Sequence, residues 1–165
     1  MPTTLDDIGD FLAQRRIALV GLSRNPKDFS RLLFREMSQR GYDMVPVNPA
    51  ARELEDRRCF ASVQEIAPPV AGVLIMTAPR ETDRVVRDCA QAGVRRVWMH
   101  RGGGQGAVSR EAAEFCRQNG IRLVEGYCPL MFLPKASFFH RVHGFILKLV
   151  GGYPSRVPET PHSPV

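Results

Sequence analysis

Five short apolar segments, each set off by a stretch with helical spacing, constrain the fold of this chain most. The first is IALVG at residues 17–21, which is apolar along almost its whole length. A strand with apolar side chains on both faces must be covered on both faces, as in a parallel α/β sheet. The remaining strands are expected at residues 42–47, 71–77, 96–100 and 121–126.

Helical patterns separate these strands. A first helix is expected over residues 4–14, where the hydroxyl of Thr4 can serve as the N-cap. Further helices are expected over residues 29–40, 81–92 and 110–119, and a glycine follows each of them. Strands that alternate with helices through short connections form a doubly wound parallel sheet. The sequence therefore predicts an α/β fold with about five parallel strands.

Length and charge narrow the class of protein. A chain of 165 residues fits one domain. Its 23 basic and 17 acidic residues give a net charge of +6, which suits an anionic ligand but is equally typical of a solubilising surface. Basic residues are scattered without interleaved aromatic side chains, so nucleic-acid binding is not expected.

The cysteines and the N-terminal sequence indicate a cytoplasmic protein. No two cysteines have Cys-x-x-Cys spacing, so we expect reduced thiols rather than a zinc site or a disulfide framework. We find no signal-peptide pattern and no apolar run long enough to span a membrane. The four cysteines are Cys59, Cys89, Cys116 and Cys128.

The C-terminal region departs from the alternation, so we expect a domain at 1–128, a helical extension at 129–153 and a disordered tail at 154–165. The tail contains four prolines. Within the extension, a helix over 135–150 would be apolar on one face. That face either packs on the domain or on a second copy in a homodimer, which we favour, or lies on a membrane surface. The apolar face consists of Phe138, Phe139, Val142, Phe145, Ile146 and Leu149.

The loop after the first strand has the chemistry of a phosphate site. Ligands of open α/β sheets bind at the carboxyl ends of the strands. Here Gly21 allows backbone to approach a ligand, Ser23 can donate a hydrogen bond, and Arg24 and Lys27 supply positive charge. The N-terminus of the following helix is expected to add a partial positive pole. A plain turn with solvated basic residues remains the alternative.

The later strand ends are polar but carry no acid. Val47, Asn48 and Pro49 follow the second strand, where NAD-binding domains place a carboxylate for the ribose hydroxyls. The missing acid fits a phosphorylated ribose better than a free diol, and it also fits a domain without a nucleotide.

The third and fourth strand ends are less specific. Thr77, Ala78 and Pro79 follow the third strand, and the proline is expected to delay the next helix and leave an open shelf. His100 ends the fourth strand and precedes RGGGQG, which either gives a ligand access to backbone or forms a mobile loop.

The strings VGLSRNPKDFS, GYDMVPVNP, VLIMTAP, VWMHRG and NGIRLVEGYC occur in this order. Over about residues 10–128 the chain resembles the small CoA-binding domain proteins, which are similar to the N-terminal domain of the succinyl-CoA ligase alpha subunit. The resemblance implies a Rossmann-like fold that holds coenzyme A, or an acyl-CoA, at the strand ends. The residues carried over to that site are Gly21, Ser23, Arg24, Lys27, Val47, Asn48, Pro49, Thr77, Ala78, Pro79 and His100.

The loops that follow the first strands form the mouth of the expected site. A mouth that is basic and free of acids would suit the diphosphate and the ribose 3′-phosphate of CoA. The glycine-rich stretch after His100 departs from the family pattern, and the ligase's phosphorylated-histidine domain is absent, so no ligase activity is transferred. We expect a CoA-binding module without catalysis of its own. The alternative is an enzyme that acts on an acyl-CoA or depends on NAD(P). Cys128, near the ligand side, is either a buried apolar residue, which we favour, or a partner for the CoA thiol.

Overall fold

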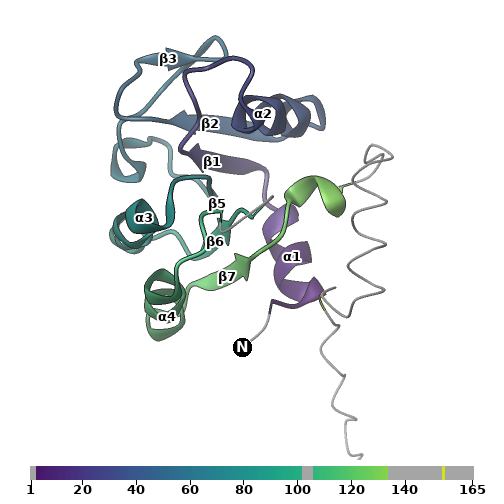
Figure 1. The fold of residues 1–165 in the computed structure, drawn as a ribbon, viewed down its shortest axis with the longest axis vertical. Coiled ribbons are helices and arrows are strands. Elements are labelled where there is room, and N and C mark those ends of the chain that lie inside the picture. The colour runs from purple at the N-terminus through teal and green to yellow at the C-terminus, as the bar shows by residue number, and fades with distance from the viewer. Residues whose placement is uncertain (1–2, 102–105, 134–153, 155–165) are drawn as a thin grey trace, which may run out of the picture.

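The computed structural model describes residues 3–101, 106–133 and 154. Its main sheet has five parallel strands in the order β2-β1-β5-β6-β7, which confirms the predicted α/β fold (Figure 1). The observed strand boundaries differ from the expected ones by one or two residues. The strands are β1 (Arg16–Val20), β2 (Asp43–Val47), β5 (Gly72–Ile75), β6 (Arg96–Met99) and β7 (Arg122–Glu125).

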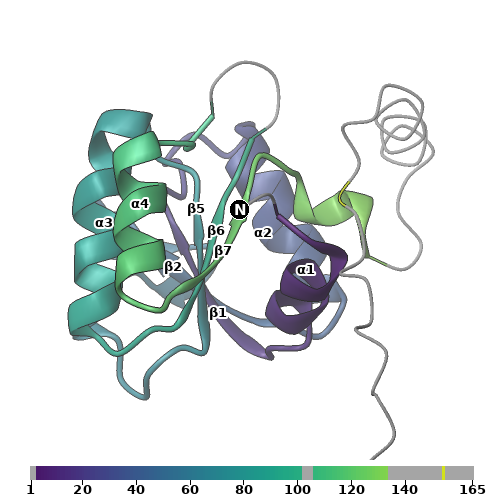
Figure 2. The same ribbon diagram turned by 90° about the horizontal axis from the view of Figure 1, so that it is seen from below.

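Helices cover both faces of the sheet, as its apolar strands require. α1 and α2 lie on one face, and α3 and α4 lie on the other (Figure 2). Thr4 caps α1 as expected, because its hydroxyl accepts a hydrogen bond from the backbone N–H of Asp7 at 3.1 Å. The four helices are α1 (Leu5–Leu12), α2 (Phe29–Gln39), α3 (Pro79–Gln91) and α4 (Arg110–Gln118).

The core consists of two apolar layers, one on each side of the sheet. Successive side chains of a strand point to opposite faces, so each apolar strand contributes to both layers. The layer under α1 and α2 includes Ile17, Leu19, Leu74 and Trp98. The layer under α3 and α4 includes Ala18, Val20, Val73, Ile75, Val97 and Met99.

The start of α3 differs from the expectation. We expected Pro79 to delay the helix and leave an open shelf, and this was wrong, because α3 begins at Pro79 itself. Proline is well tolerated at the first helical position, where its missing N–H has no helical partner and its fixed φ suits the helix. The first turn of α3 therefore stands where the shelf was expected.

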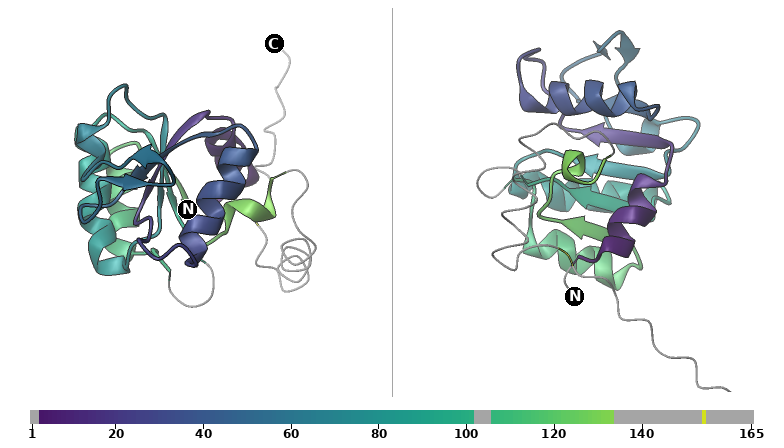
Figure 3. Two further views of the ribbon diagram at one scale, coloured as in Figure 1. Left: turned by 90° about the horizontal axis from the view of Figure 1, so that it is seen from above. Right: turned by 90° about the vertical axis from the view of Figure 1, so that its right-hand side faces the viewer.

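A small hairpin lies beyond the β2 edge of the sheet (Figure 3). It consists of β3 (Glu53–Leu54) and β4 (Arg57–Arg58), which pair antiparallel. The two turn residues, Glu55 and Asp56, have positive φ angles of 55° and 54°. The chain then passes through a short helical turn, η1 (Val63–Glu65), before it enters β5.

After β7 the chain forms a second short turn, η2 (Pro129–Met131), whose residues pack in the layer under α1 and α2. Beyond residue 133 only Pro154 belongs to the described part. The predicted helix over 135–150, the homodimer through it and the disordered tail therefore lie outside the described residues. Within the described ranges, no helix is long and apolar enough to cross a membrane.

Candidate ligand-binding site

The strand order creates a switch point between β1 and β5. The chain goes from β1 to β2 on one side and continues from β5 to β7 on the other, and such a point opens a crevice at the carboxyl ends of the strands. Gly21 and Thr77 meet there. A Cβ atom on Gly21 would lie 3.0 Å from the backbone nitrogen of Thr77, and the φ angle of Gly21 is +90°. Glycine is therefore required where the two loops cross.

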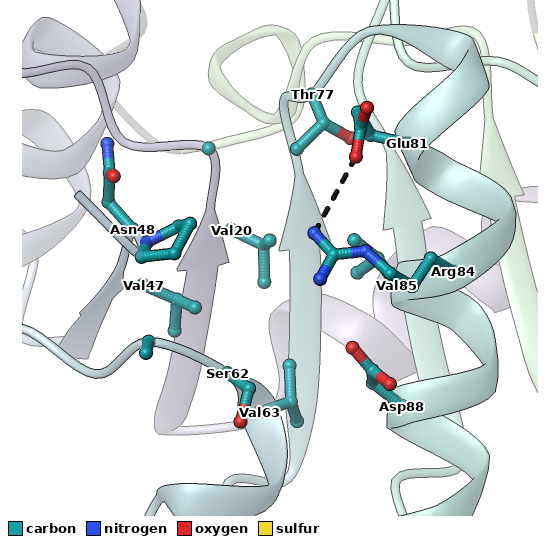
Figure 4. Close-up of a pocket in the computed structure, with 13 residues that line it drawn as sticks. Val20, Val47, Asn48, Ser62, Val63, Thr77, Glu81, Arg84, Val85 and Asp88 are labelled. Atoms are coloured by element: carbon teal, nitrogen blue, oxygen red, sulfur yellow. Dashed lines mark ion pairs between the residues drawn. The ribbon is translucent and has the colours of Figure 1, made fainter.

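A cavity of about 170 Å³ lies beside this crossing, between α3 and the segment around η1 (Figure 4). We call it the α3 groove. Ligand pockets for drug-sized molecules usually span about 300–1,000 Å³, so the groove can enclose only part of a nucleotide-sized ligand. Its lining residues are Val20, Gly21, Val47, Asn48, Pro49, Ala61, Ser62, Val63, Thr77, Glu81, Arg84, Val85 and Asp88.

The structure brings together some of the predicted site residues and separates others. The predicted residues that line the groove are Gly21, Val47, Asn48, Pro49 and Thr77. The predicted residues that lie outside its lining are Ser23, Arg24, Lys27, Ala78, Pro79 and His100. The groove therefore joins the ends of β1, β2 and β5, but it does not include the fourth strand end.

Asn48 connects two loops of the site. Its Nδ2 donates a hydrogen bond to the carbonyl oxygen of Leu22 at 2.8 Å. Its Oδ1 accepts one from the backbone N–H of Ala50, also at 2.8 Å. Because both ends of the amide are engaged within the protein, Asn48 fixes the loop after β2 against the loop after β1.

The loop after β1 is internally ordered and exposes its basic side chains. The hydroxyl of Ser23 accepts a hydrogen bond from the backbone N–H of Asn25 at 3.1 Å. Arg24 and Lys27 are exposed. Asp28 caps α2 and accepts a hydrogen bond from the backbone N–H of Ser30 at 2.8 Å. The N-terminus of α2, which was expected to attract a phosphate, thus already faces the carboxylate of Asp28.

The expectation of an acid-free mouth was wrong. Glu81 and Asp88, both on α3, line the groove. Glu81 pairs with Arg84 at 3.6 Å (Figure 4), and Asp88 accepts a hydrogen bond from Nε2 of Gln64 at 2.9 Å.

Neither residue was predicted, because site residues were expected only where the chain directly leaves a strand. Residues 81, 84, 85 and 88 follow the i, i+3, i+4, i+7 spacing of one helix face. That spacing could have predicted that they line the same surface.

His100 lies on the other face of the sheet. Its ring contacts that of Phe29, the first residue of α2, with 5.5 Å between the ring centroids. The side chain is buried, and burial lowers its pKa to about 4, so the imidazole is neutral at pH 7. Its Nε2 has no hydrogen-bond partner among the described residues. The glycine-rich residues 102–105 that follow lie outside the described part.

The four cysteines are buried and free. Burial raises the pKa of Cys128 to about 11, so its thiol stays protonated at pH 7. This supports the apolar interpretation of Cys128 over a reactive one. In the described ranges, no group of three or more His, Cys, Asp or Glu side chains could hold a metal ion.

Comparison with known proteins identifies related sequences. An uncharacterized protein of Bacillus subtilis, YneT, is 27% identical over 114 residues, which are 69% of this chain and 82% of that protein. The acetate–CoA ligase (ADP-forming) II of Archaeoglobus fulgidus is 27% identical over 128 residues, 73% of this chain but 19% of the ligase. This chain therefore spans about a fifth of that enzyme.

Solved structures share the fold. A hypothetical protein from Pyrococcus horikoshii superposes with a TM-score of 0.71 and 28% identity, over 78% of this chain and 91% of that one. A dinucleotide-forming acetyl-coenzyme A synthetase from Ca. Korarchaeum cryptofilum superposes with a TM-score of 0.56 and 26% identity, over 66% of this chain and 25% of the enzyme. The model of the CoA binding domain family matches residues 15–134, which include all five strands of the sheet. The chain thus belongs to the CoA-binding domain family.

Proposed function

We propose that this protein binds coenzyme A, free or acylated, at the carboxyl ends of β1, β2 and β5, and has no catalytic activity of its own. The observation that carries the proposal is the α3 groove, where Gly21, Asn48 and Thr77 from three strand ends meet at the switch point. The CoA in the names of the ligase relatives supports this choice of ligand. The rest of those enzymes lies outside the match, so their reaction is not part of the proposal.

In this proposal the diphosphate of CoA lies along the loop after β1. Arg24 and Lys27 extend from that loop into solvent, where they can reach an anion. A hydrogen bond between a cationic side chain and a phosphate contributes about 1.5–3 kcal/mol. Two such contacts would give the site its preference for a ligand rich in phosphate.

The buried state of the nucleophilic groups supports a binding role. Burial raises the pKa of Cys128, and His100 is neutral and lies on the opposite face from the groove. NAD is the second candidate ligand, because Glu81 and Asp88 could accept hydrogen bonds from the hydroxyls of an unphosphorylated ribose.

Isothermal titration with CoA, dephospho-CoA and NAD tests the proposal. Replacing Arg24 and Lys27 together by alanine should weaken CoA binding at least tenfold, since about 1.4 kcal/mol corresponds to a factor of ten. The effect should be equal for dephospho-CoA if both residues contact the diphosphate, and smaller if either contacts the 3′-phosphate.

The matched control removes the same charge from the opposite edge of the sheet. The pair Arg95→Ala and Arg122→Ala, at the amino ends of β6 and β7, should change CoA affinity by no more than about twofold. Tight NAD binding without CoA binding would overturn the proposal. Binding of neither ligand would indicate a family member that has kept the fold and lost the ligand.

A further inference from the structure

We infer that an apolar surface on and beside α2 is the docking site for residues 134–153 of this same chain. The surface, which we call the α2 strip, consists of Phe29, Leu32, Tyr127 and Phe132. It lies on the side of the sheet that α1 and α2 cover, whereas the α3 groove lies on the other side. The inference therefore concerns a second site and does not depend on the proposed function.

Two residues of α2 leave apolar surface in contact with water. Phe29 is 40% exposed and Leu32 is 46% exposed, and no other large apolar side chain is exposed among the residues that the structure describes. The two residues are three positions apart, so they lie next to each other on one face of the helix. Covering both with another apolar surface is favourable, because it removes their exposed area from water.

A series of contacts connects this pair with the last described turn of the chain. The ring of Phe29 packs against that of His100. The following residue, Arg101, donates its backbone N–H to the carbonyl oxygen of Tyr127 at 3.4 Å. The half-buried ring of Tyr127 contacts that of Phe132, with 5.9 Å between the ring centroids. Figures 2 and 3 accordingly show η2 beside α2.

The position of the chain ends keeps residues 134–153 close to the α2 strip. Leu133 is buried and packs in the layer under α1 and α2, and the next described residue, Pro154, is also buried. The intervening chain therefore begins and ends at buried positions. Because it starts beside α2, this short connection holds it at a high effective concentration near the strip.

The sequence of this segment contains a surface that matches the strip. A helix over residues 135–150 would carry six apolar side chains on one face, and that face needs apolar cover. The six residues are Phe138, Phe139, Val142, Phe145, Ile146 and Leu149.

The size of the exposed pair favours this segment over a second copy of the chain. A stable interface between two proteins buries about 800 Å² on each partner. Phe29 and Leu32 together offer far less exposed surface than that. A segment of the same chain can use so small a surface, because it loses no translational freedom on docking.

The first experiment is a double-mutant cycle in the full chain. Leu32→Ser should lower the melting temperature of the wild-type protein by about 3 °C, because it removes apolar contact with the segment. With Phe139→Ser and Phe145→Ser already present, Leu32→Ser should have no effect, since the contact is lost. Leu123→Ser is the matched control on the other side of the sheet, and its effect should be the same in both backgrounds. Equal effects of Leu32→Ser in the two backgrounds would overturn the inference.

The second experiment detects the contact directly by disulfide formation. Leu32→Cys is combined in turn with a cysteine at each of the six apolar positions, and after oxidation at least one pair should form a disulfide within one chain. His140→Cys and Gly144→Cys are the controls, because these residues would lie on the opposite face of the helix. The four native cysteines are buried, so they should not compete. Non-reducing electrophoresis and mass spectrometry identify the products.

The outcomes distinguish the possible occupants of the α2 strip. Disulfides within one chain from the apolar face, and not from the control positions, would support docking of residues 134–153. Disulfides between two chains would assign the strip to a second copy, and no disulfide at any of the six positions would show that the segment docks elsewhere. Equal disulfide formation at the control positions would reflect random collision. Either of the last two results would overturn the inference.

Discussion

His100 is a buried titratable side chain at the end of β6. Only 6% of its surface is exposed, and its Nε2 lacks a hydrogen-bond partner among the described residues. Burial lowers its pKa from an ordinary value of 6.5 to about 4, because the charged imidazolium loses its hydration. Between these two pH values the unfolded chain binds more protons at this site than the folded one. Its contribution to stability is therefore fully present above about pH 6.5 and is lost as the pH falls towards 4.

A His100→Gln variant should remove this acid sensitivity. As the pH falls from 7 to 4, the free energy of unfolding of the wild-type protein should drop by about 3 kcal/mol more than that of the variant, since one pKa unit corresponds to about 1.4 kcal/mol. Urea unfolding at a series of pH values measures the difference. All other ionisable groups are the same in the two proteins, so their contributions cancel in the difference. Parallel pH profiles of the two proteins would show that the pKa of His100 in the folded protein is not lowered.

At the scale of elements, an ion-pair cluster joins α2, the β3–β4 turn and the loop after β1. Glu55, in the turn, pairs with both Arg31 and Arg35 of α2. Hydrogen bonds from Arg35 and Arg31 hold the pKa of Glu55 below its ordinary value. Arg31 also donates a hydrogen bond to the carbonyl oxygen of Ser23 at 3.0 Å. The buried guanidinium of Arg31 thus holds the loop that carries Arg24 against α2.

Removing the charge of Glu55 should therefore be costly. Glu55→Gln leaves Arg31, whose side chain is 10% exposed, without a counter-charge, and should lower the free energy of unfolding by about 3 kcal/mol. Arg35→Gln is the control, because the Arg35 side chain is 44% exposed and its ion pair should contribute much less to stability than that of Arg31. Equal, small losses in the two variants would mean that the cluster does not hold these elements together.

At the scale of the whole molecule, the buried members of both apolar layers in the described part lie between Ile8 and Leu133. The chain leaves that part at Leu133, which is 6% exposed and belongs to the layer under α1 and α2. The loops around the α3 groove all precede this point. Ligand binding and the predicted helix over 135–150 should therefore be separable.

Truncation after residue 133 tests this separation. If the apolar face with Phe139 and Phe145 packs on the domain or on a second copy, its loss should lower the melting temperature by about 5 °C or more, while CoA affinity is retained. Differential scanning calorimetry and titration measure the two properties. An unchanged melting temperature would contradict packing, and loss of binding to anionic vesicles in the same variant would favour the membrane alternative.

Local signals in the sequence were sufficient to predict the fold class. The apolar character of both faces of IALVG required helices on both sides of the sheet, and the structure has two apolar layers there. Thr4 caps its helix as its position indicated, because a cap depends only on residues within one turn. Gly21 was expected at this turn because it lets the backbone approach a ligand, whereas the close contact that requires glycine there is with Thr77 of another loop.

The composition of the site depended on tertiary structure. The order of the strands placed Glu81 and Asp88 of α3 across the groove from Asn48. No pattern of neighbouring residues in the sequence predicts that these side chains line one cavity. His100 packs against Phe29 on the opposite face of the sheet, away from the groove that the first three strand ends share. The sequence by itself determined which segments form strands and helices, because hydrophobic period and capping act between near neighbours. Only the tertiary structure decided which side chains share a cavity and which charges remain unpaired, because both depend on distances between residues far apart in the chain.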